Sequence, residues 1–82
     1  MQVVITPEAR KQYERLPAPE QKKIKRKLFV LVSSPLEGKK LSGSMSELRS
    51  LKAWPYRILY YIDDAQTSVF VVTIAHRQGV YK

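Results

Sequence analysis

Residues 48–63, LRSLKAWPYRILYYID, limit the possible folds of this chain more than any other segment. They contain the only Trp and three of the five Tyr, and they predict two short strands joined at Trp54-Pro55. From residue 56 onward, the side chains alternate between two strand faces: Tyr56, Ile58, Tyr60 and Ile62 on one, and Arg57, Leu59 and Tyr61 on the other. Because both faces are largely apolar, we expect this strand to be central and at least partly covered on both sides.

A second apolar segment, residues 69–75 with the sequence VFVVTIA, predicts another buried strand. The polar residues 63–67, DDAQT, separate it from the preceding strand and predict a turn. Strands that follow one another in sequence usually pair, so we expect antiparallel pairing here. Residues 76–82, HRQGVYK, form a short polar tail.

The start of the chain predicts a strand followed by a helix. Residues 2–5 are a short run rich in β-branched side chains, which suits a first strand. A helix is expected from Thr6 and Pro7, because threonine is a good N-cap and proline is favoured at the first helical position. Its apolar face consists of Ala9, Tyr13 and Leu16. The helix is expected to end at Leu16, before Pro17.

A second helix is expected from residue 18 to Ser33-Ser34-Pro35. Its apolar stripe consists of Ile24, Leu28, Leu31 and Val32. Residues 35–46 are rich in Gly, Ser and Lys and predict a connecting loop, with Leu41 held against the core. The order β-α-α-β-β-β predicts a single α+β domain, residues 1–82, in which a helical hairpin packs on a largely antiparallel sheet.

The composition excludes several kinds of site. The chain has no Cys and one His, so we expect no disulfide, no metal site and no other cofactor. It also lacks a Gly-rich phosphate loop, the paired carboxylates of metal-dependent nucleases and a convincing Ser-His-Asp set. No apolar run approaches the roughly 18 residues of a membrane span, and the N-terminus has no secretory pattern. We therefore expect a cytoplasmic protein without a membrane partner.

The charge favours a polyanionic partner. There are 15 Lys and Arg residues against 7 Asp and Glu residues, a net charge of +8 that is spread through the folded body. Nucleic acid, an acidic protein or an anionic membrane would suit this excess, and a soluble surface without a partner is the alternative. The basic run at residues 22–27 is open to two interpretations, a solvated helix face or a docking surface for RNA or an acidic segment.

Three basic residues around the strands are candidates for phosphate binding. Arg57 lies within an apolar strand, where a charge is costly unless it is paired or faces an open surface. Its planar guanidinium suits a phosphate, and the alternative is a structural bond to Asp63, Asp64 or a carbonyl. Lys52 can approach Arg57 across the bend, whereas Arg49 can lie nearby or on the opposite face. An ordinary exposed cation is the alternative for both.

The tail and the connecting loop add further candidates. Arg77 follows the last strand directly. His76 is a weaker candidate, because one histidine cannot supply both the general acid and the general base. Tyr81 can stack on an RNA base or pack the tail onto the sheet. Lys39 and Lys40 can contact a polyanion or be solvated.

Together, the segments LRSLKAWPYRILYYID and VFVVTIAHRQGVYK resemble the RelE branch of the RelE/ParE toxin superfamily. The resemblance extends over essentially the whole chain, including TPEARKQYERLP, the basic second helix and SSPLEGKKLSG. It implies the toxin of a type II toxin–antitoxin pair that cuts mRNA in the ribosomal A site without a metal. In that reaction the ribose 2′-OH attacks the adjacent phosphate, which leaves a cyclic phosphate and a free 5′-OH.

The resemblance also implies roles for individual residues. The family's strand cation corresponds to Lys52, the arginine of its Tyr-Arg pair to Arg57, the arginine after its last strand to Arg77, and its C-terminal tyrosine to Tyr81. Arg57 and Arg77 would hold the phosphate, and Lys52 would transfer a proton or neutralise charge. Tyr81 would stack on or orient a base. Auxiliary or substrate-binding roles fall to Arg49, His76, Lys39 and Lys40.

Two alternatives remain open at this level. One is a ParE-type toxin that binds and inhibits DNA gyrase, and the other is an inactive, basic nucleic-acid-binding relative. The cations Lys52, Arg57 and Arg77 favour the nuclease, because a gyrase-binding toxin does not need them. Either toxin implies a cognate antitoxin, acidic or partly disordered, in a toxin–antitoxin hetero-oligomer. The nuclease also implies the ribosome and mRNA as partners.

Overall fold

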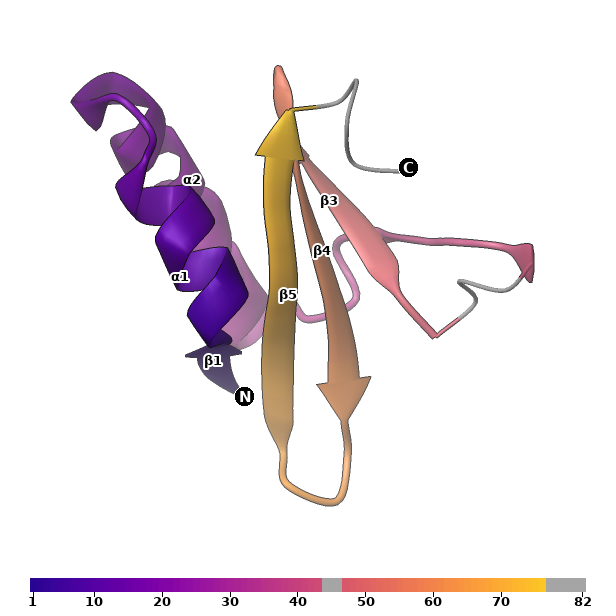
Figure 1. The fold of residues 1–82 in the computed structure, drawn as a ribbon. Coiled ribbons are helices and arrows are strands. Elements are labelled where there is room, and N and C mark those ends of the chain that lie inside the picture. Colours follow the sequence, from indigo (N-terminus) through magenta and orange to yellow (C-terminus); the bar gives the residue numbers. More distant parts are fainter. Residues whose placement is uncertain (44–46, 77–82) are drawn as a thin grey trace.

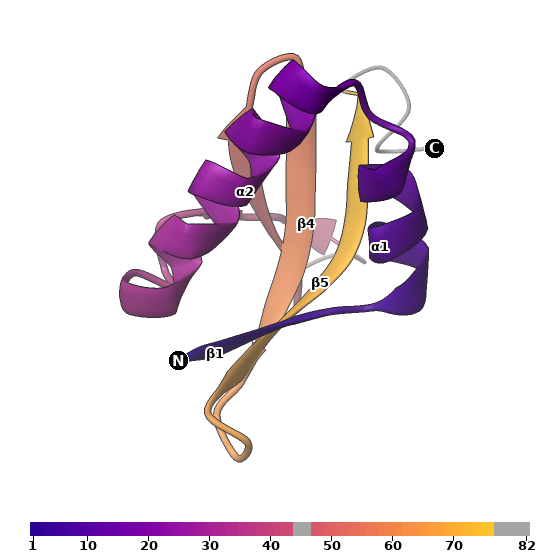
Figure 2. The same cartoon turned by 90° about the vertical axis from the view of Figure 1, so that its left-hand side faces the viewer.

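The computed structural model describes residues 1–43 and 47–76, and its two helices pack on one side of a twisted sheet (Figures 1 and 2). The elements are β1 (Gln2–Ile5), α1 (Pro7–Glu14), α2 (Ala18–Ser33), β2 (Lys39–Lys40), β3 (Arg49–Ala53), β4 (Tyr56–Asp63) and β5 (Ser68–His76). The strand order is β1-β5-β4-β3-β2. β1 runs parallel to β5, and the other neighbouring strands are antiparallel. The predicted α+β fold, a helical hairpin on a largely antiparallel sheet, is confirmed.

The main difference from the prediction is β2, which lies in the segment expected to be a loop. Lys39 pairs with Ser50 of β3, and Lys40 pairs with Arg49. Both lysines are exposed. A two-residue edge strand held by its backbone has no apolar alternation, so periodicity cannot reveal it.

The helices follow the prediction with two exceptions. The N-cap Thr6 accepts a hydrogen bond from the backbone N–H of Ala9 at 3.5 Å, but α1 ends at Glu14, before the predicted end at Leu16. In α2, the predicted apolar stripe is buried except for Val32, which is 41% exposed. Val32 lies about 100° around the helix from Leu31, which places it at the margin of the buried stripe.

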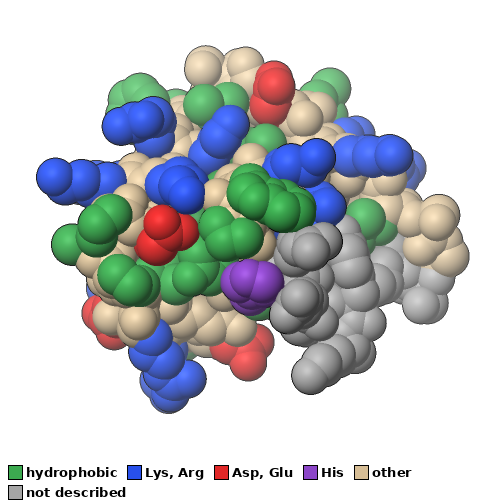
Figure 3. Space-filling model, turned by 90° about the horizontal axis from the view of Figure 1, so that it is seen from above, with side chains coloured by type: hydrophobic (Ala, Val, Ile, Leu, Met, Phe, Trp, Pro, Cys, Tyr) green, Lys and Arg blue, Asp and Glu red, His purple; other side chains and the backbone are tan. Residues whose placement is uncertain are grey.

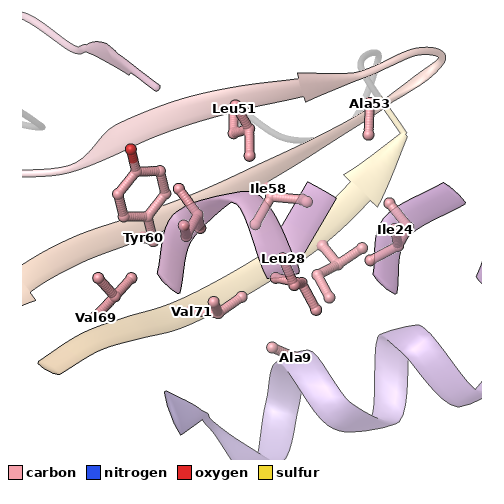
Figure 4. Packing of buried hydrophobic residues seen from close by; sticks show 11 residues of the cluster. Ala9, Ile24, Leu28, Leu51, Ala53, Ile58, Tyr60, Val69 and Val71 are labelled. Atoms are coloured by element: carbon pink, nitrogen blue, oxygen red, sulfur yellow. The ribbon is translucent and has the colours of Figure 1, made fainter. Parts of the chain in front are cut away.

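The core fills the space between the helices and the sheet (Figure 4). Its buried residues are Ala9, Ile24, Leu28, Leu31, Leu51, Ala53, Ile58, Tyr60, Val69, Val71 and Ile74. From β4, Ile58 and Tyr60 are fully buried on the helix side, which confirms that these two residues share a strand face. Leu59 points the other way and is only 3% exposed. The central strand is therefore covered in part on both faces, as expected.

Polar contacts fix both helices on the sheet. The side-chain oxygen of Gln12 in α1 accepts a hydrogen bond from the backbone N–H of Ile74 at 2.6 Å. In α2, Lys23 Nζ donates to the carbonyl oxygen of Trp54 at 2.8 Å. Lys23 thus belongs to the basic run but binds the β3–β4 turn, so the run is not uniformly solvated. This contact holds the turn from which β4 begins.

Candidate phosphate-binding site

Lys52 of β3 and Arg57 of β4 lie directly opposite each other in the register of the two strands. Their neighbours Leu51, Ala53 and Ile58 belong to the core under the helices. Because side chains alternate along a strand, Lys52 and Arg57 point to the open face of the sheet. Lys52 is exposed and Arg57 is partly buried. The register confirms the expected proximity of these two cations.

Neither cation has a partner among the described residues, in which the ion pair joins Lys23 and Glu20. The structural alternative for Arg57, an ion pair with Asp63 or Asp64, is not formed. The Asp63 carboxylate instead accepts hydrogen bonds from Gln66 in the β4–β5 turn. Like charges that face each other across a strand pair are destabilising. The open face therefore carries two cations that an anion from outside can neutralise.

A hollow of about 510 Å³ adjoins this pair. Its lining consists of Lys27, Glu37, Lys39, Ser50, Leu51, Lys52 and Arg57. Lys39 joins the pair because β2 holds it opposite Ser50. Four cations here face a single carboxylate, so the hollow attracts anions. Basic side chains are also spread widely over the surface seen in Figure 3, with acidic ones scattered singly among them.

Lys27 is the residue of this hollow that sequence reasoning missed. It was part of the basic run at residues 22–27, interpreted as a solvated face or a docking surface. The available signal was its position next to Leu28, a residue of the predicted apolar stripe. A lysine beside the stripe of a helix that packs on a sheet lies near the sheet edge. The sequence does not specify which edge.

Lys40 and Arg49 lie apart from the Lys52–Arg57 pair. They are opposite each other in the register of β2 and β3, and both line a second hollow of about 480 Å³. Arg49 Nη1 donates a hydrogen bond to the carbonyl oxygen of Gly38 at 2.9 Å. Lys52 follows Arg49 by three positions, an odd number, so the two side chains leave β3 on opposite faces. Of the two positions left open for Arg49, the structure shows the one on the opposite face.

The hydroxyl of Tyr60 holds the connecting segment in place beside the site. It donates a hydrogen bond to the carbonyl oxygen of Pro35 at 2.7 Å and accepts one from the N–H of Gly38 at 2.9 Å. A Cβ atom at position 38 would lie 2.6 Å from this hydroxyl oxygen, so only glycine fits. Burial raises the pKa of Tyr60 above its ordinary 10.0. Leu41 was expected to hold this segment against the core. It is only partly buried and lies outside the core.

His76 is the last described residue of β5, and its ring meets the edge of the Tyr56 ring at a centroid distance of 5.8 Å. The register pairs His76 with Tyr56, and Tyr56 packs against the core. His76 therefore lies on the face opposite Arg57. Its auxiliary role stays a prediction. Arg77 and Tyr81, two of the predicted site residues, lie outside the described residues.

Residues 1–43 and 47–76 contain no group of three or more His, Asp or Glu side chains arranged to hold a metal ion. No helix in these ranges is long and apolar enough to cross a membrane.

Comparison with known proteins decides the family. A family model described as the ParE toxin of the type II toxin–antitoxin system parDE matches residues 3–81. This chain belongs to that toxin family. The predicted membership of the RelE/ParE superfamily is therefore confirmed, and the protein is the toxin of a type II toxin–antitoxin system. A search of curated proteins found no match.

Solved structures of RelE toxins are similar over nearly the whole chain. The toxin–antitoxin complex RelBE2 from Mycobacterium tuberculosis has 32% identity and a TM-score of 0.85, and the match covers 93% of this chain and 96% of that one. The isolated RelE toxin of E. coli has 27% identity and a TM-score of 0.80, with 92% and 82% covered. The archaeal RelE–RelB complex from Pyrococcus horikoshii, with 17% identity, a TM-score of 0.77 and 96% and 97% covered, shows the fold alone.

Proposed function

We propose that this toxin is a ribosome-dependent endoribonuclease that cleaves mRNA in the A site and so stops translation in the cytoplasm. The observation that carries the proposal is the facing pair Lys52–Arg57. The pair lies on the open face, has no partner in the described ranges and carries like charges opposite each other. An arrangement that costs stability and offers two donors to an anion is typical of a functional site.

The proposed chemistry requires charge stabilisation rather than a metal ion. The 2′-oxygen of the ribose loses its proton and bonds to the adjacent phosphorus. The bond from phosphorus to the 5′-oxygen breaks, and that oxygen takes up a proton. The products are a 2′,3′-cyclic phosphate and a free 5′-OH. The pentacoordinate transition state carries extra negative charge, which fixed cations stabilise more than they stabilise the substrate.

Each residue has a proposed part in this reaction. Arg57 donates to the phosphate oxygens with its guanidinium fork, and Arg77 is proposed as a second phosphate clamp. Lys52 neutralises charge or assists proton transfer beside Arg57. Lys39, which lines the same hollow, binds a neighbouring phosphate of the mRNA. Tyr81 is proposed to stack on or orient a base.

The similarity to the RelE toxins supports both the proposed activity and the proposed partners. The M. tuberculosis structure is a toxin–antitoxin complex, so we propose that this chain also forms a hetero-oligomer with its antitoxin. The net charge of +8 favours an acidic antitoxin. The ribosome and the mRNA are the remaining proposed partners.

The experiment is inducible expression in bacteria followed by mapping of mRNA 5′ ends. We expect new ends within translated codons for the wild type, and their loss in Arg57→Ala, because removal of one charge-stabilising donor lowers the rate about 10²–10³-fold. Arg15→Ala removes an exposed arginine next to the end of α1 and is the matched control. Its cleavage pattern is expected to equal that of the wild type.

The family model also names ParE, so the gyrase alternative needs a readout of its own. DNA supercoiling and strand breaks are measured in the same cultures. Growth arrest with altered supercoiling and without new mRNA ends would replace the nuclease proposal by gyrase inhibition. A folded Arg57→Ala protein that cleaves as well as the wild type would remove Arg57 from the site.

A further inference from the structure

The hollow at the Lys52–Arg57 pair extends around the edge of β3. In the described register β2 pairs with Arg49 and Ser50, so β3 has no strand beside it from Leu51 onward on that side. Side chains from both faces of β3 therefore reach the hollow, Lys52 from the open face and Leu51 from the helix-covered face. A ligand can approach this place from the side of the sheet as well as from the open face.

Glu37 is the only acidic residue among the described residues that line this hollow. Lys39 lies opposite Ser50, and the chain just before Lys39 runs along β3 toward Lys52. Two positions before Lys39, Glu37 therefore lies beside Lys52, and the order across the sheet edge is Arg57, Lys52, Glu37. On the line of β2, at about 4.8 Å between neighbouring strands, the backbone at Glu37 is roughly 10 Å from that at Arg57.

Backbone hydrogen bonds hold Glu37 in place. Its own N–H donates to the carbonyl oxygen of Ser34 at 3.1 Å, and the next N–H, that of Gly38, donates to the hydroxyl of Tyr60 at 2.9 Å. The Glu37 side chain is exposed. The ion pair in the part of the chain that the structure describes lies within α2 and does not involve Glu37. The backbone thus positions this carboxylate, and none of the roles considered above uses it.

We propose that Glu37 is the general base of the cleavage reaction and accepts the proton of the ribose 2′-OH. This role rests on the proposed RNA-cleaving function and supplies a step that the function requires. The 2′-oxygen gives its proton to the Glu37 carboxylate, and its electron pair bonds to the phosphorus. The bond from phosphorus to the 5′-oxygen breaks, and that oxygen takes up a proton from Lys52 or water. Glu37 then returns its proton to water.

The other side chains of the hollow are poorly suited to this step. A carboxylate is ionised at neutral pH and accepts a proton, whereas ammonium and guanidinium groups are donors without an acceptor atom. Ser50 has a hydroxyl, which is a much weaker base than a carboxylate, and it is only 5% exposed. The one histidine of the chain, His76, lies on the face opposite Arg57.

The position of Glu37 relative to the two phosphate-binding cations also suits a base. In a reactive geometry the 2′-oxygen lies about 3–3.5 Å from the phosphorus. A base must be within hydrogen-bond reach of that oxygen, so it has to line the same hollow as the groups that hold the phosphate. Glu37 meets this condition together with Lys52 and Arg57.

The test is single-turnover cleavage by saturating purified toxin on ribosomes that carry a defined mRNA. Glu37→Gln keeps the size of the side chain but cannot accept the proton, so the cleavage rate should fall about 10²–10⁴-fold. Glu37→Asp keeps a carboxylate and should retain more of the rate than Glu37→Gln. Glu14→Gln, which removes an exposed carboxylate at the end of α1 with the same change in net charge, is the matched control and should cleave like the wild type.

A 2′-O-methyl oligonucleotide, which lacks the attacking hydroxyl, separates catalysis from binding. In fluorescence anisotropy, Glu37→Gln should bind it at least as tightly as the wild type, because the substitution removes a negative charge near the bound phosphate. An affinity more than tenfold weaker would make Glu37 a binding or structural residue and overturn the proposal. Thermal unfolding of each variant verifies that the comparison uses folded protein.

An mRNA with sulfur in place of the 5′-oxygen at the cleaved bond distinguishes a general base from a general acid. A thiolate leaves without prior protonation, so loss of a general acid has little effect on this substrate. Glu37→Gln should still cleave it about 10²–10⁴-fold more slowly than the wild type. Recovery of the wild-type rate would overturn the role as a base. Glu37→Gln that cleaves ordinary mRNA as fast as the wild type would do the same and leave the nuclease proposal intact, whereas a wild type that cleaves no mRNA rejects both.

Discussion

The two faces of the sheet differ in whether their polar side chains have partners. On the helix-covered face, the hydroxyl of Tyr60 is fully buried and makes hydrogen bonds to both Pro35 and Gly38. On the open face, Lys52 and Arg57 lie opposite each other and have no partner among the described residues. A buried polar group without partners would destabilise a small domain by about 1–3 kcal/mol, whereas a partly exposed one remains solvated until a ligand binds. We infer that stability resides on one face of β4 and activity on the other.

The largest expected effect on stability is on the helix-covered face, at Ile58. Ile58→Ala removes a fully buried side chain from the centre of the core and leaves a cavity. We expect the free energy of unfolding to fall by about 2–5 kcal/mol, measured by urea denaturation. Lys11→Ala changes an exposed residue of α1 and should stay within about 0.5 kcal/mol of the wild type. An Ile58→Ala protein as stable as the wild type would contradict the assignment of this face.

Arg57→Met tests whether the open face contributes to activity rather than to stability. The cleavage rate should fall about 10²–10³-fold, because a donor to the transition-state charge is lost. Stability should stay equal or rise by about 0.2–1 kcal/mol, because the repulsion with Lys52 disappears. Urea denaturation and mRNA 5′-end mapping of one preparation separate the two effects. A loss of stability comparable to that of Ile58→Ala would instead make Arg57 a structural residue.

Tyr60→Phe tests how the covered face depends on its hydrogen bonds. The substitution leaves the N–H of Gly38 and the carbonyl of Pro35 without this partner, at a cost of about 1–3 kcal/mol for an unsatisfied buried group. It should not alter the chemistry at Arg57 in protein that remains folded. Stability from urea curves and cleavage by the folded fraction are the two measurements. A variant with wild-type stability would show that the two hydrogen bonds contribute nothing.

The same tyrosine predicts how stability depends on alkaline pH. Burial raises the pKa of Tyr60 in the folded state above 10.0, so the folded protein holds this proton more tightly than the unfolded chain. The contribution is fully present below about pH 10 and is lost as the pH rises through the raised folded pKa. Urea curves measured above pH 10 should therefore show a steeper decline for the wild type than for Tyr60→Phe. Equal declines would mean that another group controls alkaline unfolding.

The covered face was readily predicted from sequence because its signals are periodic. Alternation in residues 56–63 placed Ile58 and Tyr60 on one face of a strand expected to be covered on both sides. The bend at Trp54-Pro55 allowed Lys52 to approach Arg57, and the register shows that they are opposite each other. The strand β2, the Gly38–Tyr60 contact and the contribution of Lys27 were not predictable. Each depends on how segments distant in sequence meet, and a two-residue edge strand or a lysine beside a helix stripe has no pattern of its own.

The smallest expected effect distinguishes two neighbouring lysines of β2. Lys39 lines the hollow of Lys52 and Arg57, whereas Lys40 lines the hollow beside Tyr61. If Lys39 binds a phosphate, Lys39→Gln should lower the slope of log affinity against log salt concentration by about 0.7 for a single-stranded oligonucleotide. The loss of affinity should be the same for all sequences, because a phosphate contact does not read bases.

Lys40→Gln serves as the contrasting variant in the same salt titration. Because Lys40 pairs with Arg49 and lines the second hollow, away from the Lys52–Arg57 pair, Lys40→Gln should change the salt slope less than Lys39→Gln does. Lys11→Gln, on α1, should leave both slope and sequence preference unchanged. An unchanged salt slope in Lys39→Gln would show that this residue binds no phosphate and would leave Lys52 and Arg57 as the phosphate-binding residues of this hollow.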